Sequence, residues 1–308
     1  MAMDCFYHNP VMLDECLEGL NINPSGVYAD VTFGGGGHSK AILDRLDDDG
    51  RLFVFDQDAD AMDNVPDDPR IVFFRSNFRY FAQFLRLAGC PKIDGILADL
   101  GVSSHHFDDA MRGFSFRFDV PLDMRMNQSA GFSARELVNT YSVDQLKKVF
   151  LEYGEIKNAW HLAQNIVAYR AEKPIVTVSD LIAAAGKCVT LHSENKYLAT
   201  MFQAIRIEVN GEIEVLHDFL NATTGALKEG GRLVIMTYHS LEDRPVKNFM
   251  KAGNFEGKEE KDFYGNVIAP FYMVNRKVIT PSEEELQQNS RSRSAKLRIA
   301  ERTMFDYE

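Results

Sequence analysis

The stretch from Val27 to Asp56 restricts the fold of this chain more than any other part of its sequence. Residues 27–31 are strand-forming and lead into a loop with four consecutive glycines at positions 34–37. Glycine has no Cβ, so the backbone of such a loop can come close to a ligand. A helical pattern opening at His38 and a second strand over residues 51–56 follow. This order predicts a parallel α/β sheet that binds a ligand at its carboxyl edge.

The spacing of the loop indicates which ligand it binds. Asp56 follows Gly34 by 22 residues, a distance at which an acidic side chain can accept hydrogen bonds from a ribose diol. A dinucleotide site would have the pattern G-x-G-x-x-G, whereas here Asp30 comes first and the glycines are contiguous. The arrangement resembles the cofactor loop of S-adenosylmethionine-dependent methyltransferases. A tight turn without a ligand is the alternative, and the flanking strands and acids disfavour it.

Two further strands extend the pattern. Residues 71–74 and 93–100 read as strands with a helix between them, so three βα units in a row predict a doubly wound sheet. Phe78 follows the third strand, where it can cover an adenine ring, although core packing is the more common use of such a residue. Asp99 lies at the end of the fourth strand, and a buried acid there favours a functional role.

After this sheet pattern the chain changes character. An irregular stretch rich in arginine and aromatic residues covers positions 112–126, and helical patterns with capping-box spacing at Ser133 and Thr177 come next. We therefore expect an α/β domain made of residues 1–104 and 206–308, interrupted by an all-helical insertion over residues 105–205. The insertion is the candidate for recognising RNA.

The last third of the chain returns to the sheet. A helical pattern over residues 195–226, broken at Gly211, precedes a fifth strand over residues 232–238. The segment HSLEDR follows it, and its Ser240 and Asp243 have capping-box spacing. We expect His239 to be exposed at the crevice, and Pro245 predicts an irregular helix start. Residues 271–279 and 295–301 are candidates for final, antiparallel strands.

Composition excludes several classes of protein. The chain has no apolar run of about 18 residues and no basic-then-apolar leader, which predicts a cytoplasmic protein without a membrane partner. Its four cysteines are scattered, so we expect neither a metal site nor a disulfide framework. A net charge of −11 argues against nonspecific coating of nucleic acid. Positive charge is nevertheless concentrated at Arg112, Arg117 and Arg125 and again in the tail over residues 291–302.

Six motifs, in order along nearly the whole chain, resemble the RsmH (MraW) family. They are DxTFGxGGHS at 30–39, DLGVSS at 99–104, RGFSF at 112–116, PLDMRM at 121–126, FQAxRIxVN at 202–210 and HSLEDR at 239–244. The resemblance implies a Rossmann-like class I methyltransferase fold with a helical insertion. It also implies S-adenosyl-L-methionine as cofactor and N4-methylation of a cytidine in the decoding centre of bacterial 16S rRNA.

The same resemblance carries a set of site residues onto this chain. The cofactor contacts that it implies are Gly36, Gly37, His38, Asp56, Phe78, Asp99 and His106. The last of these stands where the family usually has Gln, and Val120 and Pro245 are further departures outside the cofactor set.

For the chemistry, we expect Asp99 or nearby backbone carbonyls to accept hydrogen bonds from the cytosine amine, with His239 as a second candidate catalytic residue. Phe or His side chains would stack the extruded base. Arg112, Arg117 and Arg125 are expected to contact RNA.

Two other functions compete with this interpretation. A nicotinamide-dependent oxidoreductase would share the sheet but not the glycine spacing, and a noncatalytic RNA-binding factor would not need Asp56 or the glycine loop. The acidic net charge favours an assembled small ribosomal subunit over free RNA as substrate. The sequence leaves a homodimer open.

Overall fold

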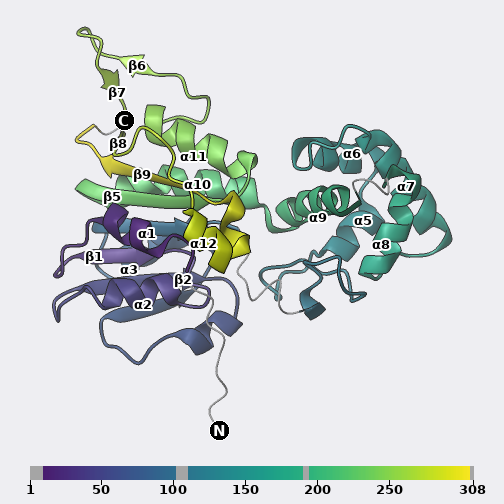
Figure 1. Ribbon diagram of the computed structural model, residues 1–308, viewed down its shortest axis with the longest axis horizontal. Helices are drawn as coiled ribbons and strands as arrows, with labels where there is room; N and C mark the ends of the chain where they lie inside the picture. The colour runs from purple at the N-terminus through teal and green to yellow at the C-terminus, as the bar shows by residue number, and fades with distance from the viewer. Residues whose placement is uncertain (1–9, 102–109, 190–193, 306–308) are drawn as a thin grey trace. The chain divides into compact units, whose positions relative to one another are not determined.

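The computed structural model describes residues 10–101, 110–189 and 194–305 (Figure 1). The chain divides into two compact units. One combines Met1–Gly101 with Ile213–Glu308 and is called the sheet unit; the other, Val102–Glu212, is called the helical unit. The helical unit ends beyond the expected boundary at residue 205, because the long helix before Gly211 packs its apolar side chains into the helical core.

A seven-stranded sheet forms the centre of the sheet unit, in the order β3-β2-β1-β4-β5-β9-β8. The strands are β1 (Val27–Asp30), β2 (Arg51–Asp56), β3 (Ile71–Arg75), β4 (Ile93–Asp99), β5 (Leu227–Thr237), β8 (Phe271–Met273) and β9 (Lys296–Arg302). β1 to β5 pair in parallel, whereas β9 is antiparallel to both β5 and β8. This order, with one reversed strand near an edge, is the class I methyltransferase fold that the sequence predicted.

Helices cover both faces of the sheet because successive strand residues point to opposite sides. Ile96 of β4 and Ile235 of β5 belong to one core, which contains side chains of α3 (Phe81–Leu87), α10 (Glu212–Ala226) and α11 (Ser240–Ala252). Their neighbours Leu97 and Val234 belong to the other core, with α1 (Leu13–Leu20) and α2 (Gly37–Leu43). The remaining helical segments of this unit are η1 (Asp60–Asn64), η2 (Phe78–Tyr80), α12 (Glu283–Gln288) and η5 (Ser290–Ser294).

The helical unit has its own core. The helical segments among its described residues are η3 (Ala110–Arg112), α5 (Ala134–Thr140), α6 (Val143–Glu152), α7 (Ala159–Glu172), α8 (Val178–Ala185), η4 (Gly186–Cys188) and α9 (Glu194–Asn210). The capping boxes predicted at Ser133 and Thr177 are confirmed, and Ser142 with Gln145 forms another that was not predicted. The predicted break at Gly211 is also confirmed, since α9 ends before it and its φ is 59°.

The structure corrects two expectations in the last third of the chain. β5 begins at Leu227 rather than at residue 232 and includes Gly230 and Gly231, and its pairing with β4 shifts in register between Ile93 and Gly95. α11 is helical from Ser240 through Pro245, so the expected irregular start is absent from this segment. Two arginines of the tail, Arg298 and Arg302, lie on β9 and are buried.

The sheet unit also has a two-stranded arm that was not predicted from the sequence. β6 (Glu260–Lys261) and β7 (Val267–Ile268) pair as an antiparallel hairpin between α11 and β8 (Figure 1). Every helix in the described part of the chain is too short or too polar to cross a bilayer.

Candidate active site at the carboxyl edge of the sheet

The glycine loop connects β1 to α2 at the carboxyl edge. Gly34 and Gly36 have φ angles of 52° and 76°, a conformation that side chains rarely adopt. A Cβ built on Gly36 would lie 2.9 Å from the Phe33 ring, and the Gly36 N–H donates to the Phe33 carbonyl at 2.8 Å. Glycine is therefore required at this position by both space and backbone angle.

Asp30 ties the end of β1 to the start of α2. Its Oδ2 accepts a hydrogen bond from the Ser39 hydroxyl at 2.6 Å, and its Oδ1 accepts one from the Thr32 N–H at 3.1 Å. Burial raises the pKa of this carboxyl, although the bond from Ser39 opposes the shift. Asp30 belongs to the predicted pattern of acids, but the sequence alone gave it no role.

Asp56 lies at the end of β2 and contacts the same loop. Its Oδ2 accepts from the Gly34 N–H at 2.9 Å and its Oδ1 from the Asp58 N–H at 2.8 Å. Asn64 adds a bond from its amide to the Gly34 carbonyl at 3.2 Å. The residue predicted to bind a ribose thus also fixes the shape of the glycine loop.

Asp99, at the end of β4, is joined to a tyrosine that was not predicted to belong to the site. The Tyr238 hydroxyl donates to Asp99 Oδ1 at 2.8 Å, and the Asp99 N–H donates to Thr32 Oγ1 at 2.7 Å. Burial raises the pKa of Asp99 to about 6, and the nearby carboxylates of Asp30 and Glu242 contribute to the increase. Tyr238 follows β5, the strand next to β4, and that adjacency was the signal that could have identified it.

His38 and Phe78 have structural contacts as well as predicted cofactor roles. His38 is buried, and its Nε2 lies 3.0 Å from the Val11 carbonyl. Phe78 is partly buried, and its ring packs edge-to-face on Phe219 with centroids 5.3 Å apart. Core packing therefore explains part of the position of Phe78, while its place after β3 keeps it at the carboxyl edge.

The prediction that His239 is exposed is wrong. Its side chain is only 13% exposed, and its Nε2 lies 3.0 Å from Glu242 Oε1. Glu242 lies in the first turn of α11, and its side chain bends back toward the residues before the helix, where its Oε2 accepts from the Tyr238 N–H at 3.0 Å. The N-cap position is taken by His239, and Asp243 binds Arg298 at 2.8 Å, so the expected capping box of Ser240 with Asp243 does not form.

The three arginines expected to contact RNA differ in their surroundings. Arg112 is buried, and its Nη2 donates to the carbonyls of Arg125 and Met126 at 3.0 and 3.1 Å. Arg125 binds Asp123 through Nε at 2.8 Å and Nη2 at 2.6 Å, whereas Arg117 is exposed. Arg112 holds the irregular stretch together through these bonds. Its burial and contacts therefore favour a structural role over the predicted contact with RNA. His106 lies outside the described residues.

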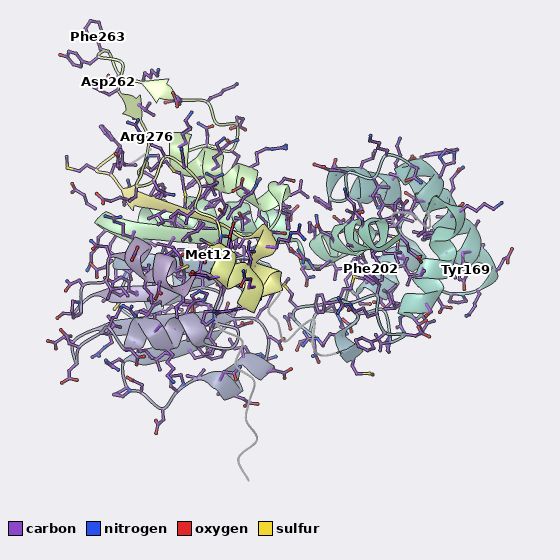
Figure 2. The ribbon with its side chains drawn as sticks, viewed as in Figure 1. Met12, Tyr169, Phe202, Asp262, Phe263 and Arg276 are labelled. Carbon is purple, nitrogen blue, oxygen red and sulfur yellow. The ribbon has the colours of Figure 1, made fainter. Side chains whose placement is uncertain are left out.

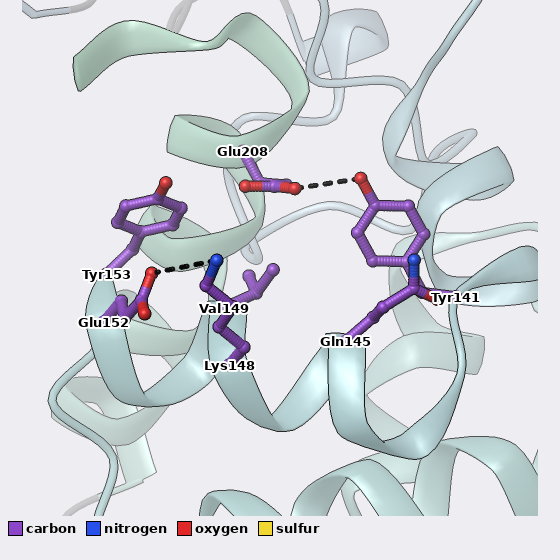
Figure 3. Close-up of a pocket in the computed structure, with 7 residues that line it drawn as sticks. All are labelled: Tyr141, Gln145, Lys148, Val149, Glu152, Tyr153 and Glu208. Atoms are coloured by element: carbon purple, nitrogen blue, oxygen red, sulfur yellow. Dashed lines mark hydrogen bonds and ion pairs between the residues drawn. The ribbon is translucent and has the colours of Figure 1, made fainter. Parts of the chain in front are cut away.

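The helical unit has a surface cavity of about 180 Å³ that contains none of these residues (Figure 3). It is lined by Tyr141, Gln145, Lys148, Val149, Glu152, Tyr153 and Glu208. The Tyr141 hydroxyl donates to Glu208 at 2.8 Å across it, and burial together with this carboxylate raises the pKa of Tyr141 to about 12. The tyrosine is therefore a hydrogen-bond donor at neutral pH rather than a base.

Comparisons with known proteins agree with the motifs. Residues 5–303 match the sequence profile described as the MraW methylase family. A protein from Parabacteroides distasonis named "Ribosomal RNA small subunit methyltransferase H" is 58% identical over 300 residues, which cover 97% of this chain and 98% of that protein. A protein of the same name from Flavobacterium johnsoniae is 53% identical and covers 96% of this chain and 98% of its own length. Among solved structures, TrmN from Thermus thermophilus is 11% identical with a TM-score of 0.43, and the alignment covers 94% of this chain and 48% of that one.

Proposed function

Because this chain belongs to the MraW methylase family, we propose that it transfers a methyl group from S-adenosylmethionine to N4 of a cytidine in the decoding centre of bacterial 16S rRNA. The observation that carries the proposal is the Asp99–Tyr238 pair beside the glycine loop. It places an acid with a raised pKa at the edge where sheets of this kind bind their ligands.

The residues at this edge fit S-adenosylmethionine. The loop around Gly36 offers backbone without side chains, Asp56 offers a carboxylate for ribose hydroxyls, and Phe78 offers a ring for the adenine. The acids also suit a sulfonium cation, because a positive charge near Asp30 and Asp99 would relieve part of the cost of burying them. We assign the cofactor to Gly36, Gly37, His38, Asp56, Phe78 and Asp99. When bound, the cofactor supplies an electrophilic methyl group.

Asp99 is suited to hold the amine of the acceptor base. The lone pair of a cytosine amine is delocalised into the ring, so an acceptor for its N–H groups favours the geometry needed for attack. Tyr238 holds Asp99 Oδ1, and in the described part of the chain no donor bonds to Oδ2. With a pKa of about 6 the carboxylate is mostly ionised at neutral pH and can take the proton that the amine loses on methylation.

The substrate that we propose is an assembled small ribosomal subunit rather than free RNA. A net charge of −11 weakens attraction to a naked phosphate backbone, so recognition must come from local features such as the exposed Arg117. A homodimer is compatible with the proposed reaction, which requires residues of one sheet unit only.

The proposal is tested by transfer of labelled methyl from S-adenosylmethionine to small subunits from cells that lack this protein, followed by identification of the modified nucleoside. We expect N4-methylated cytidine, and more product from assembled subunits than from protein-free 16S rRNA. Cofactor binding without transfer to either substrate would contradict the proposed substrate, and a different methylated nucleoside would contradict the proposed atom.

A further inference from the structure

The β6–β7 hairpin presents two aromatic rings to solvent at its tip. Phe263 is 97% exposed and Tyr264 is 86% exposed. Figure 2 shows Phe263 at the far end of the hairpin, away from the sheet. Single exposed apolar residues are ordinary on protein surfaces, but two adjacent aromatic rings at the end of a projecting arm are not.

The tip has a defined conformation that holds these rings outward. Asp262 Oδ1 accepts from the N–H groups of Tyr264 and Asn266 at 2.9 and 2.8 Å, and its Oδ2 accepts from the Asn266 side chain at 2.9 Å. The Gly265 N–H closes the turn on the Asp262 carbonyl at 3.0 Å. The two rings stand edge-to-face, with an interplanar angle of 86°. The turn therefore fixes the backbone at both rings, which lowers the entropy lost when they bind a partner.

The small apolar area of the tip indicates the kind of partner. Polar or charged residues flank the two rings, namely Lys261, Asp262 and Asn266. A stable protein interface buries about 1,000 Å² or more, which two rings on a polar arm do not provide. One or two unpaired nucleobases, in contrast, match an aromatic pair in size and stack on it without a wider apolar rim.

Positive charge on the neighbouring helix suits the same partner. Arg244, Lys247 and Lys251 are exposed at positions three and four residues apart on α11, so they share one face of the helix that leads to the arm. Lys251 is paired with Glu259 at 2.7 Å, so the positive charge that this face offers to phosphates comes from Arg244 and Lys247. Such a face attracts phosphates in a protein that is acidic overall.

From these features we propose that the hairpin is an RNA-docking arm, whose Phe263 and Tyr264 rings stack on unpaired bases of the small-subunit rRNA. This inference rests on the proposed function for the identity of the RNA. The arm supplies affinity for the substrate and takes no part in methyl transfer.

The test compares the double variant Phe263→Ala/Tyr264→Ala with the wild-type protein in two measurements. The first is co-sedimentation with small subunits, and the second is the KM and kcat of methyl transfer to them. We expect the dissociation constant and KM to rise about tenfold or more, with kcat at saturating subunits and the cofactor dissociation constant unchanged. Leu87→Ala is the matched control, because Leu87 is 82% exposed on α3, outside the arm.

A second pair of variants separates stacking from general apolar contact. Phe263→Tyr/Tyr264→Phe keeps both rings and should bind subunits with wild-type affinity. Phe263→Leu/Tyr264→Leu keeps apolar area but no ring, so its affinity for subunits should fall nearly as far as that of the alanine variant. Wild-type affinity in the alanine or leucine variant would overturn the proposal. A change in the sedimentation coefficient of the free alanine variant would overturn it in favour of self-association. If the wild-type protein binds subunits through the arm but transfers no methyl group, the proposed function fails and the docking arm stands.

Discussion

Two carboxylates of the sheet unit and two of the helical unit are stabilised in opposite ways. In the sheet unit, Asp30 and Asp99 accept hydrogen bonds from hydroxyl groups, and burial raises the pKa of both. In the helical unit, Asp180 binds the Lys173 ammonium at 2.6 Å, which lowers its pKa to about 2, and Asp123 binds Arg125, which lowers its pKa against the effect of burial. Of these four acids, only the two in the helical unit are neutralised by a cation.

The difference separates structural from chemical use of the same side chain. A carboxylate paired with a cation stabilises the fold and is unreactive over the physiological pH range. A carboxylate that is buried without a cation and held only by uncharged donors destabilises the fold when ionised, and such residues cluster at functional sites. The comparison therefore assigns the chemistry to the sheet unit. Substitutions in the sheet unit should mainly change turnover, and substitutions in the helical unit should mainly change stability.

Asp99→Asn should have the largest effect. An amide cannot take the proton released by the amine, so kcat should fall about 100-fold or more, measured as methyl transfer at pH 7.5. Asp94→Asn is the control, since Asp94 lies near the start of the same strand and pairs with Lys228 at 2.8 Å, outside the glycine loop. Full turnover of Asp99→Asn with unchanged cofactor affinity would show that Asp99 is not the acceptor.

Asp99→Asn should lower kcat but raise the stability of the folded protein. The pKa of Asp99 in the folded state, about 6, exceeds its ordinary value of 3.8, so the folded protein binds this proton more tightly than the unfolded chain. The carboxyl therefore favours folding below pH 3.8, and this contribution is lost as the pH rises through about 6. Asp99→Asn should unfold at higher urea concentration than wild type at pH 7.5, with a smaller difference at pH 4.5.

Arg112→Ala should be the most destabilising of these changes. It removes a buried guanidinium and leaves the carbonyls of Arg125 and Met126 without that donor, at a cost of about 2–4 kcal/mol of unfolding free energy. Arg117→Ala should leave the urea midpoint within error and weaken binding to subunits a few-fold. Equal stability of the two variants would remove the structural role of Arg112.

Asp180→Ala should destabilise the helical unit by about 1–2 kcal/mol, because it breaks the capping box with Thr177 and the ion pair with Lys173. Its pKa is depressed to about 2, so this stabilisation is present above the ordinary carboxyl pKa and is lost only as the pH falls toward 2. Asp144→Ala, an exposed acid in the first turn of α6, is the control. Denaturation monitored by Trp160 fluorescence reports on this unit, and cofactor affinity should not change.

Tyr238→Phe should have the smallest effect. The tyrosine hydroxyl lowers the pKa of Asp99, so its removal should move the acidic limb of the kcat profile from about pH 6 to higher pH. Turnover should fall a few-fold near pH 6.5 and approach the wild-type value at pH 8.5. Tyr272→Phe on the exposed side of β8 is the control and should not change the pH dependence of kcat. If neither variant shifts the acidic limb, Asp99 is not the group that titrates there.

The sequence predicted the strands well where burial on both faces makes an apolar run, as at residues 51–56 and 93–100. It predicted the glycine loop and the acids at strand ends because their chemistry is local. It did not predict the Asp99–Tyr238 bond or the burial of His239, because both depend on which strands are neighbours and on how Glu242 turns back at the start of α11. The structural role of Arg112 was missed for a similar reason. Its two acceptors are backbone carbonyls, which every residue has, so no residue type in the sequence indicates them.

The position of β9 has a consequence for how the protein is made. This strand comes after the other six in the chain, yet it lies between β5 and β8. Its Arg298 also binds Asp243 in the first turn of α11. A growing polypeptide can therefore assemble the helical unit early, whereas the sheet beside β5 must wait for residues 296–302 to leave the ribosome. The apolar edge that β9 later covers is exposed during this interval, so a chaperone would matter most before β9 has been synthesised.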